Sequence, residues 1–134
     1  TIYLPEDISQ RYGLPVLGVL GWREEELQAN MNYRYPREKV GLLLLEETTE
    51  NLPEVTANPE TVRLSDGIQI YEKLRGFDTV AVQVPCGQKN GKQLQHLLEQ
   101  LQLQDCPADG VILSNGDKKL LDQYYGRKTG RRGQ

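Results

Sequence analysis

The sequence predicts an α/β fold in which a mostly parallel sheet is flanked by helices. Four short apolar runs, rich in β-branched residues, have the length and composition of buried strands. Segments with the apolar spacing of helices separate the later runs, which is typical of parallel strands. The chain has 134 residues, of which 37% are hydrophobic, and this suits one domain with a substantial core.

The first half of the chain supplies two of these strands. A helix is expected over Pro5–Gly13, because proline opens it, two acids follow in its first turn and glycine ends it. The runs Val16–Leu20 and Val40–Leu45 predict strands. Between them, Trp22–Met31 fits one or two helical turns. The acidic, proline-containing stretch Glu46–Pro59 is expected to be a loop.

A further helix is expected before the third strand. Ser65 is a residue type that caps helices, and the helix is expected to run to about Arg75. Its spacing predicts that Ile68, Tyr71 and Leu74 face inward.

The last third of the chain repeats the alternation of strands and helices. Strands are expected over Thr79–Val84 and Gly110–Ser114, and helices over Lys92–Leu103 and Asp117–Tyr125. Residues 126–134 form a basic tail. The chain is therefore expected to be a single domain, residues 1–134, with residues 1–21 packed on it.

Composition excludes several classes of protein. The longest apolar run, Val40–Leu45, is far shorter than the roughly 18 residues of a membrane span. Thr1–Pro15 has no basic start followed by an apolar run, so no signal peptide is predicted. Cys86 and Cys106 are too few for a disulfide scaffold and are badly spaced for zinc, which favours a reducing, cytoplasmic setting.

The charge is distributed unevenly. Residues 1–70 carry 12 acidic and 6 basic residues, whereas residues 71–134 carry 7 acidic and 10 basic residues. The basic tail is interpreted as a solvated terminus, and contact with phosphate or anionic lipid is the alternative. Basic and aromatic residues do not alternate on one element, so no nucleic-acid partner is predicted.

The loop after Thr79–Val84 is the best candidate for chemistry. A strand, a glycine-containing loop and a helix follow one another here, as in phosphate-binding P-loops with the motif G-x-x-x-x-G-K-[ST]. Gly87, Asn90, Gly91 and Lys92 are therefore candidate phosphate-binding residues.

The loop also departs from that motif. Cys86 stands at the first glycine, and Gln93 replaces the hydroxyl residue that binds magnesium. No acid ends the strand Gly110–Ser114. The preferred interpretation is a loop without nucleotide chemistry, in which ATP and magnesium are disfavoured and no metal site is expected. Residual phosphate or nucleotide binding stays open as the alternative.

Nucleophilic catalysis is not predicted. Cys86 and Lys92 have the C-x5-R spacing of cysteine phosphatases, but lysine does not clamp phosphate through two hydrogen bonds and Pro85 replaces the usual histidine. A small buried cysteine is the preferred interpretation. His96, the single histidine, has no acid at a suitable spacing for a triad or metal site.

Two adjacent tyrosines lie at the end of the last expected helix. Tyr124 and Tyr125 are interpreted first as packing residues and second as phosphorylation targets.

One segment of the chain resembles a known family. The 16 residues Pro5–Leu20 read PEDISQRYGLPVLGVL. They resemble the membrane-proximal cytoplasmic segment of bacterial polysaccharide chain-length determinants and of the tyrosine autokinases fused to them. In that family a PEDVEKRLGLPVLGVIP-like stretch directly follows the second transmembrane helix.

Other segments resemble the kinase more loosely. Ile70–Arg75 is similar to its EAYRTLR helix, and Val82–Gln93 to its strand and P-loop. In one register Gly110–Gly126 pairs with KVLLIDADLRRPRLHRLFG, so that Ser114 and Gly116 take the places of two catalytic aspartates.

A second register stays open beside the first. It pairs Phe77–Val80 with the family's YDYVIIDTPP and Gly110–Ser114 with GVVLN, so that Gln83 replaces the aspartate. Both registers lack the hydroxyl and the acids that phosphoryl transfer requires.

The resemblance implies a truncated or degenerate P-loop kinase fold without catalytic activity. It further implies a cytoplasmic domain at the inner membrane, anchored by transmembrane helices outside this chain. Its expected partners are polysaccharide polymerisation and export proteins, and the full-length protein is expected to form a homo-oligomer. A nucleotide-binding regulator or residual tyrosine kinase of the same pathway is the alternative.

Overall fold

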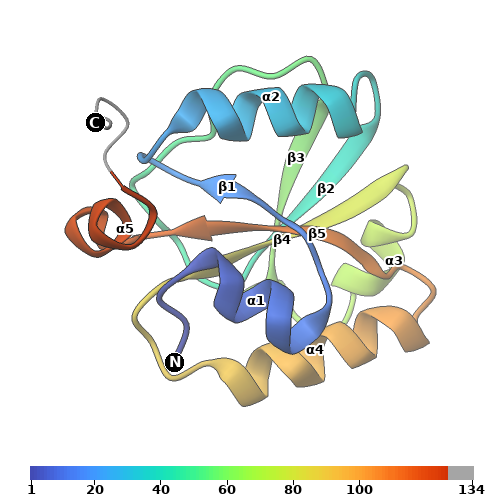
Figure 1. Cartoon of the computed structure of the whole chain (residues 1–134). Coiled ribbons are helices and arrows are strands. Elements are labelled where there is room, and N and C mark those ends of the chain that lie inside the picture. Colours follow the sequence, from blue (N-terminus) through green and yellow to red (C-terminus); the bar gives the residue numbers. More distant parts are fainter. Residues whose placement is uncertain (127–134) are drawn as a thin grey trace.

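The structure is a computed structural model that describes residues 1–126. Five strands form one all-parallel sheet in the order β1-β5-β4-β2-β3, with helices packed on it (Figure 1). The predicted α/β fold is confirmed. The strands are β1 (Val16–Val19), β2 (Lys39–Leu44), β3 (Asn58–Arg63), β4 (Thr79–Pro85) and β5 (Ala108–Ser114). The helices are α1 (Pro5–Tyr12), α2 (Glu24–Arg34), the 3-10 turn η1 (Leu64–Asp66), α3 (Ile70–Leu74), α4 (Gly91–Leu103) and α5 (Lys118–Tyr125).

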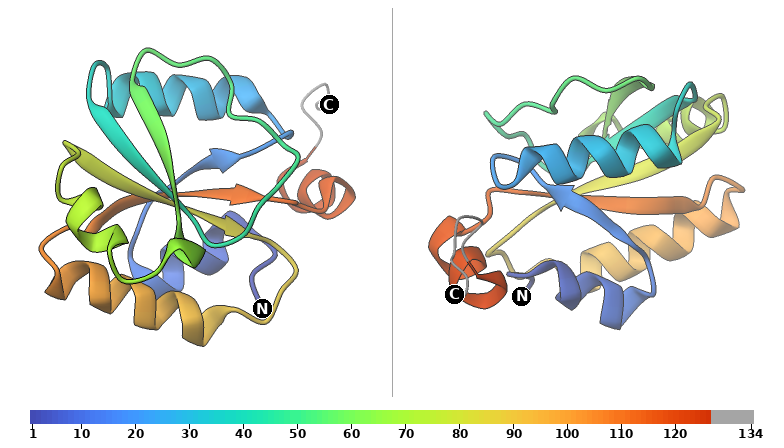
Figure 2. Two further views of the ribbon diagram at one scale, coloured as in Figure 1. Left: turned by 180° about the vertical axis from the view of Figure 1, so that it is seen from behind. Right: turned by 45° about the horizontal axis from the view of Figure 1, so that its top comes forward.

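The sheet buries both of its faces (Figures 1 and 2). On one face, Ile8 of α1, Leu74 of α3 and Leu97 of α4 pack in the same cluster as Val82. On the other face, Leu27 of α2 belongs to a second cluster. Leu52 and Val55, from the connection between β2 and β3, are partly buried and pack against it. Among residues 1–126, no helix is long and apolar enough to cross a membrane.

The segment Pro5–Leu20 packs into the domain. Ile8, Leu17 and Leu20 are buried. Leu14 and Val16, two further apolar residues of the run, are only half-buried. β1 lies at the edge of the sheet, which limits how far its side chains are covered.

The sequence predicted four strands, and the structure has a fifth, β3, where Glu46–Pro59 was expected to be a loop throughout. β3 gives little sequence signal because it is an edge strand on which only Val62 is buried. Pro59 fits there for a specific reason. The N–H of Asn58 donates to the Glu38 carbonyl, so by alternation the backbone of Pro59 faces outward and no sheet hydrogen bond is lost.

The helix predicted from Ser65 to Arg75 is wrong in extent. The chain forms the η1 turn, breaks at Gly67 with φ 96°, and resumes only at α3. Ile68, expected to face inward, lies in the break and is 83% exposed. Leu74 is buried as predicted.

The region Trp22–Met31 folds as a longer helix than one or two turns, because α2 continues to Arg34. Leu27 and Met31 are fully buried, as their spacing indicates. The helix lies so close to β1 that a Cβ on Gly18 would be 2.6 Å from the Cβ of Leu27. Glycine is therefore required at this crossing.

Candidate functional site

The carboxyl ends of β4 and β2 are where a ligand is expected in this topology. In open α/β sheets, ligands bind outside the carboxyl ends of neighbouring strands whose connections leave for opposite faces. β4 and β2 are neighbours of this kind, since β4 leads into α4 on one face and the connection after β2 packs on the other. The loop predicted to bind phosphate begins at this position.

That loop is already engaged by the N-terminal segment. The N–H of Gly87 donates to the carbonyl of Ile2 at 2.8 Å, and Ile2 itself is fully buried. Asn90 is 6% exposed and its Nδ2 donates to the carbonyl of Pro85 at 3.3 Å, whereas its Oδ1 has no partner. Gly87 and Asn90 are therefore turned to internal contacts.

Gly91 and Lys92 instead border an open cavity at the start of α4. The hydroxyl of Tyr12 donates to the carbonyl of Gly91 at 2.9 Å and ties α1 to α4 there. The cavity has a volume of about 450 Å³ and is lined by Thr1, Arg11, Tyr12, Lys89, Gly91, Lys92 and Gln95. Within residues 1–126, Arg11, Lys89 and Lys92 form no ion pair or side-chain hydrogen bond.

Arg11 and Lys89 were missed by the sequence analysis. Arg11 belongs to α1, about 80 positions from Lys92 along the chain, so no local motif joins them. For Lys89 the charge count was the available signal, since the second half of the chain is basic; no such signal marks Arg11, which lies in the acidic first half.

The residues that take the places of the kinase acids are neutral, and two of them are buried. Ser114 is 1% exposed and its Oγ has no hydrogen-bond partner. Gln83 is 3% exposed. Gly116 follows β5, where a Cβ would be 3.0 Å from Val19. In the described part of the chain, no group of three or more potential ligands could hold a metal ion.

Cys86 lies at the end of β4 and is buried. Burial is the main reason that the pKa of its thiol rises to about 12, and the nearby Glu50 and Asp7 carboxylates add to the effect. The thiol is therefore neutral at physiological pH, which disfavours thiolate chemistry. His96 is exposed on α4.

Tyr124 and Tyr125 lie together at the end of α5. Their rings meet edge to face with centroids 4.9 Å apart, and the Tyr125 ring lies 5.9 Å from that of Trp22. Tyr124 is 53% exposed, and its contact with the Glu6 carboxylate raises the pKa of its hydroxyl. One tyrosine thus packs on Trp22, and the other projects into solvent. The basic tail after Gly126 lies outside the described residues.

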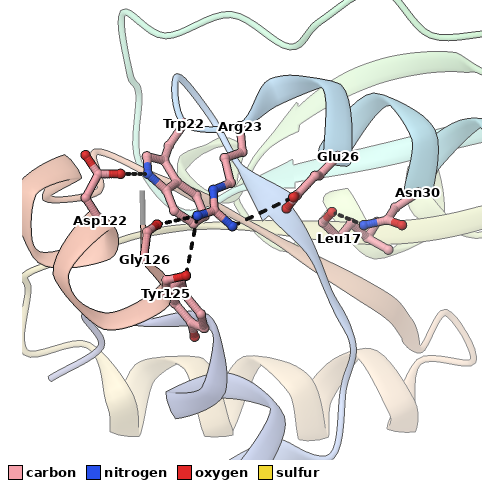
Figure 3. A network of polar contacts seen from close by, with 8 residues as sticks. All are labelled: Leu17, Trp22, Arg23, Glu26, Asn30, Asp122, Tyr125 and Gly126. Carbon is pink, nitrogen blue, oxygen red and sulfur yellow. Dashed lines mark hydrogen bonds and ion pairs between the residues drawn. The ribbon is translucent and has the colours of Figure 1, made fainter. Parts of the chain in front are cut away.

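A polar network fastens α5 to the start of α2 (Figure 3). Arg23 Nη2 donates to the carbonyl of Gly126 and, at 3.5 Å, to that of Tyr125. The Arg23 guanidinium also lies 4.5 Å from the centre of the Trp22 ring and 3.8 Å from Glu26. Arg23 thereby caps the carbonyl end of α5, where a cation is electrostatically favoured.

Comparison with known proteins assigns no family to this chain, so only its fold class is established. No family model matches the sequence, and neither the curated proteins nor the solved structures contain a match. The chain is a parallel α/β domain. At the carboxyl ends of its strands lie the loop that the N-terminal segment contacts and the basic cavity.

Proposed function

We propose that this domain is the non-catalytic cytoplasmic domain of an exopolysaccharide or lipopolysaccharide chain-length determinant. It acts by protein–protein contact with polymerisation and export proteins at the cytoplasmic face of the inner membrane. Transmembrane helices outside residues 1–134 anchor it, and the full-length protein forms a homo-oligomer. The resemblance of Pro5–Leu20 to the membrane-proximal segment of that family supports this proposal.

The contact between Gly87 and Ile2 carries the non-catalytic part of the proposal. In a working P-loop, backbone N–H groups of this loop bind the phosphates. Here the Gly87 N–H donates to the Ile2 carbonyl at 2.8 Å. Freeing that donor would expose the fully buried Ile2 side chain, whose burial stabilises the fold by roughly 1.5–3 kcal/mol.

The side chains at the strand ends also support a domain without phosphoryl transfer. Magnesium in such sites relies on one or two carboxylates in addition to the phosphates. Ser114 and Gln83, which take the places of the acids in the two alignments with the kinases, are both neutral. Neither supplies the negative charge that would hold the ion.

The test uses the full-length protein in the cell that encodes it. An in-frame deletion of residues 1–134 should change the length distribution of the surface polysaccharide on a gel. Lys92→Ala should leave that distribution as in the wild type, because the proposed role does not use the loop. An unchanged distribution in the deletion strain contradicts the role, and a Lys92→Ala strain that matches the deletion contradicts the non-catalytic assignment.

The basic cavity favours a second candidate, a nucleotide-binding regulator or residual tyrosine kinase of the same pathway. Arg11, Lys89 and Lys92 border this cavity without carboxylate partners among the described residues. The N-terminal turn of α4 lies beside them, and helix N-termini attract anions. Calorimetric titration with ATP, with and without magnesium, together with a tyrosine-phosphorylation assay, separates this candidate from the first.

A further inference from the structure

The connection between β2 and β3 is unusual for a parallel sheet. Neighbouring parallel strands are normally joined through a helix, but residues 45–57 contain neither helix nor strand. Irregular connections of about this length are uncommon in compact domains, and many of them are lids or binding loops. We call residues 46–57 the strap.

No backbone–backbone hydrogen bond among residues 1–126 holds the strap, and each of its polar contacts involves at least one side chain. The nearest backbone–backbone hydrogen bonds lie outside its two ends, from Leu45 to Gln83 and from Asn58 to Glu38. Its polar anchors are Glu46 to Gln88, Glu47 to Arg63, Thr48 and Glu50 to Asn115, Glu50 to Lys118, the Glu54 carbonyl to Gln28, and Thr56 to Asn32. Segments without backbone hydrogen bonds open at lower free energy than the sheet they cover.

The first part of the strap crosses the carboxyl ends of the strands and passes α5 (Figure 2). There the Glu50 carboxylate accepts the N–H of Asn115 at 2.6 Å and lies 3.6 Å from Nζ of Lys118. Thr48 Oγ1 donates to Oδ1 of Asn115 at 2.9 Å. Gly21 leaves room for this contact, since a Cβ there would be 3.0 Å from the Glu50 carboxylate. The backbone N–H of Asn115 and the ammonium group of Lys118 thus bind the same carboxylate.

Two buried polar side chains lie on the sheet face that the strap helps to cover. Ser114 shares a face of β5 with Ile112, and Gln83 shares a face of β4 with Ala81; Ile112 and Ala81 belong to the cluster packed by Leu52 and Val55 of the strap. The buried Oγ of Ser114 has no partner, and Gln83 makes no side-chain hydrogen bond within residues 1–126, although its amide atoms are not fully shut off from solvent. Buried polar groups without partners are uncommon and destabilise the state that contains them.

We propose that the strap covers a binding site for an acidic peptide segment, and that Glu50 occupies the carboxylate position of that site when the strap is closed. The incoming carboxylate replaces that of Glu50 on the Asn115 N–H and Lys118. Movement of the strap exposes the Ser114 hydroxyl near the Gln83 amide, and both groups donate and accept hydrogen bonds and therefore suit the amides of a peptide. This inference goes beyond the proposed function and does not rest on it.

The exchange needs little net free energy at the carboxylate position, because one carboxylate takes the place of another. Its cost lies in the contacts of Leu52 and Val55, which are only partly buried, and in exposed polar contacts such as that of Thr48 with Asn115. The new hydrogen bonds to Ser114 and Gln83 offset that cost. The weakly held strap is therefore suited to act as a cover, and Glu50 is the group that an incoming carboxylate replaces.

The first experiment measures opening of the strap with a thiol introduced beneath it. Ser114→Cys is made in a background of Cys86→Ala and Cys106→Ala, and the rate of labelling by a disulfide reagent is followed. Glu50→Ala should accelerate labelling at least tenfold at an unchanged melting temperature. Glu54→Ala is the matched control, because Glu54 contacts its neighbour through its backbone carbonyl, and it should change the rate less than twofold. Equal rates in the two variants overturn the proposal.

The second experiment keeps the native Ser114 and uses a capped peptide of residues 48–52 as the probe. In Glu50→Ala, the peptide should shift the NMR signal of the Asn115 amide, and the same peptide with glutamine for glutamate should bind at least tenfold more weakly. Lys118→Gln should weaken binding of the glutamate peptide. A peptide that leaves the Asn115 amide unshifted, or equal binding of the two peptides, overturns the proposal.

Discussion

The indole Nε1 of Trp22 donates a hydrogen bond to Oδ1 of Asp122 at 2.9 Å and so joins the turn after β1 to α5 (Figure 3). The two residues are 100 positions apart in the chain. α5 is a short helix whose one fully buried residue is Leu121, so polar contacts at its ends contribute much of its attachment. The position of the tyrosine pair therefore depends on Trp22 and its neighbour Arg23.

Removing the acceptor of this hydrogen bond should loosen α5. Asp122→Ala leaves the half-buried indole N–H without its partner, which is expected to cost about 1 kcal/mol of the free energy of unfolding. Gln123→Ala, one position further on the exposed face, is the control and should cost less than about 0.5 kcal/mol. Urea denaturation followed by Trp22 fluorescence measures both. Equal stability of the two variants would show that the hydrogen bond is not needed.

Arg23 offers a prediction in which backbone and side chain act in opposite directions. Its φ is 48°, a left-handed conformation that costs an L-residue roughly 1–2 kcal/mol. Arg23→Ala loses the cap on α5 and keeps that strain, whereas Arg23→Gly loses the cap and relieves the strain. Arg23→Gly should therefore be more stable than Arg23→Ala by about 1 kcal/mol in urea denaturation. The reverse order would mean that the left-handed conformation is not strained.

Three of the four strands that the sequence predicts correctly share one physical property, whereas β1 is an edge strand that its apolar run alone identifies. β2, β4 and β5 are buried on both faces, so their sequences are continuous apolar runs. β3 is not predicted because only one of its residues, Val62, is buried, so its sequence lacks an apolar run. Backbone pairing with β2 places Asn58–Arg63 at the edge of the sheet. Similarly, the apolar spacing places Ile68 in a helix, but the helical conformation is interrupted at Gly67.

The residues of the candidate site likewise fall into those that local sequence predicts and those that only the fold brings together. Local order along the chain identifies the loop around Gly91 and Lys92, and the structure places both beside one cavity. The contact between Ile2 and Gly87 and the contribution of Arg11 arise only when α1 packs next to α4. Contacts between residues so distant in sequence leave no spacing pattern, because topology and not periodicity creates them.

The crossing of β1 and α2 should not tolerate a side chain on Gly18. A Cβ there would lie 2.6 Å from the Cβ and 2.9 Å from the Cα of Leu27, and backbone atoms do not move aside cheaply. Gly18→Ala is expected to destabilise the domain by about 3 kcal/mol. Gly91→Ala is the control: its Cβ meets the flexible tip of Arg11 at 3.2 Å, so its cost should be below about 1 kcal/mol. Similar melting temperatures for both variants would contradict the close packing.

The ion pair between Arg34 and Asp109 predicts a pH dependence of stability. Arg34 Nε lies 2.7 Å from Oδ2 of Asp109, and this hydrogen bond is the main reason that the pKa of Asp109 is lowered, with the Tyr35 hydroxyl adding to it. A lowered native pKa means that the stabilisation is present above pH about 4 and is lost as the pH falls through the native value.

Asp109→Asn should remove that part of the acid dependence. Both partners are more than one third exposed, so the loss at neutral pH is expected to be less than about 1 kcal/mol. The free energy of unfolding is measured by urea titration from neutral to acid pH, with Asp105→Asn as the exposed control. A wild-type slope in Asp109→Asn below pH about 4 would assign the acid sensitivity to other carboxyl groups.

The basic cavity at the start of α4 yields the last prediction. Arg11, Lys89 and Lys92 border it without carboxylate partners among the described residues, so weak binding of inorganic phosphate or ATP is expected by charge alone. Magnesium should not strengthen the binding, because Gln93 and Ser114 supply no ligand for the ion. The binding should weaken steeply as ionic strength rises, since exposed charges are screened beyond about 8 Å at physiological salt.

Calorimetric titration of the domain with ATP, with and without magnesium, measures this prediction. Arg11→Gln and Lys92→Gln should each weaken binding several-fold, because each removes one of the unpaired cations, and the matched control Lys119→Gln on α5 should leave it unchanged. Tyrosine phosphorylation is expected to be absent from the same samples, because no group of three or more potential ligands in the described chain could hold the metal ion that phosphoryl transfer uses. Micromolar binding that requires magnesium, or phosphate incorporated at Tyr124 or Tyr125, would overturn the prediction.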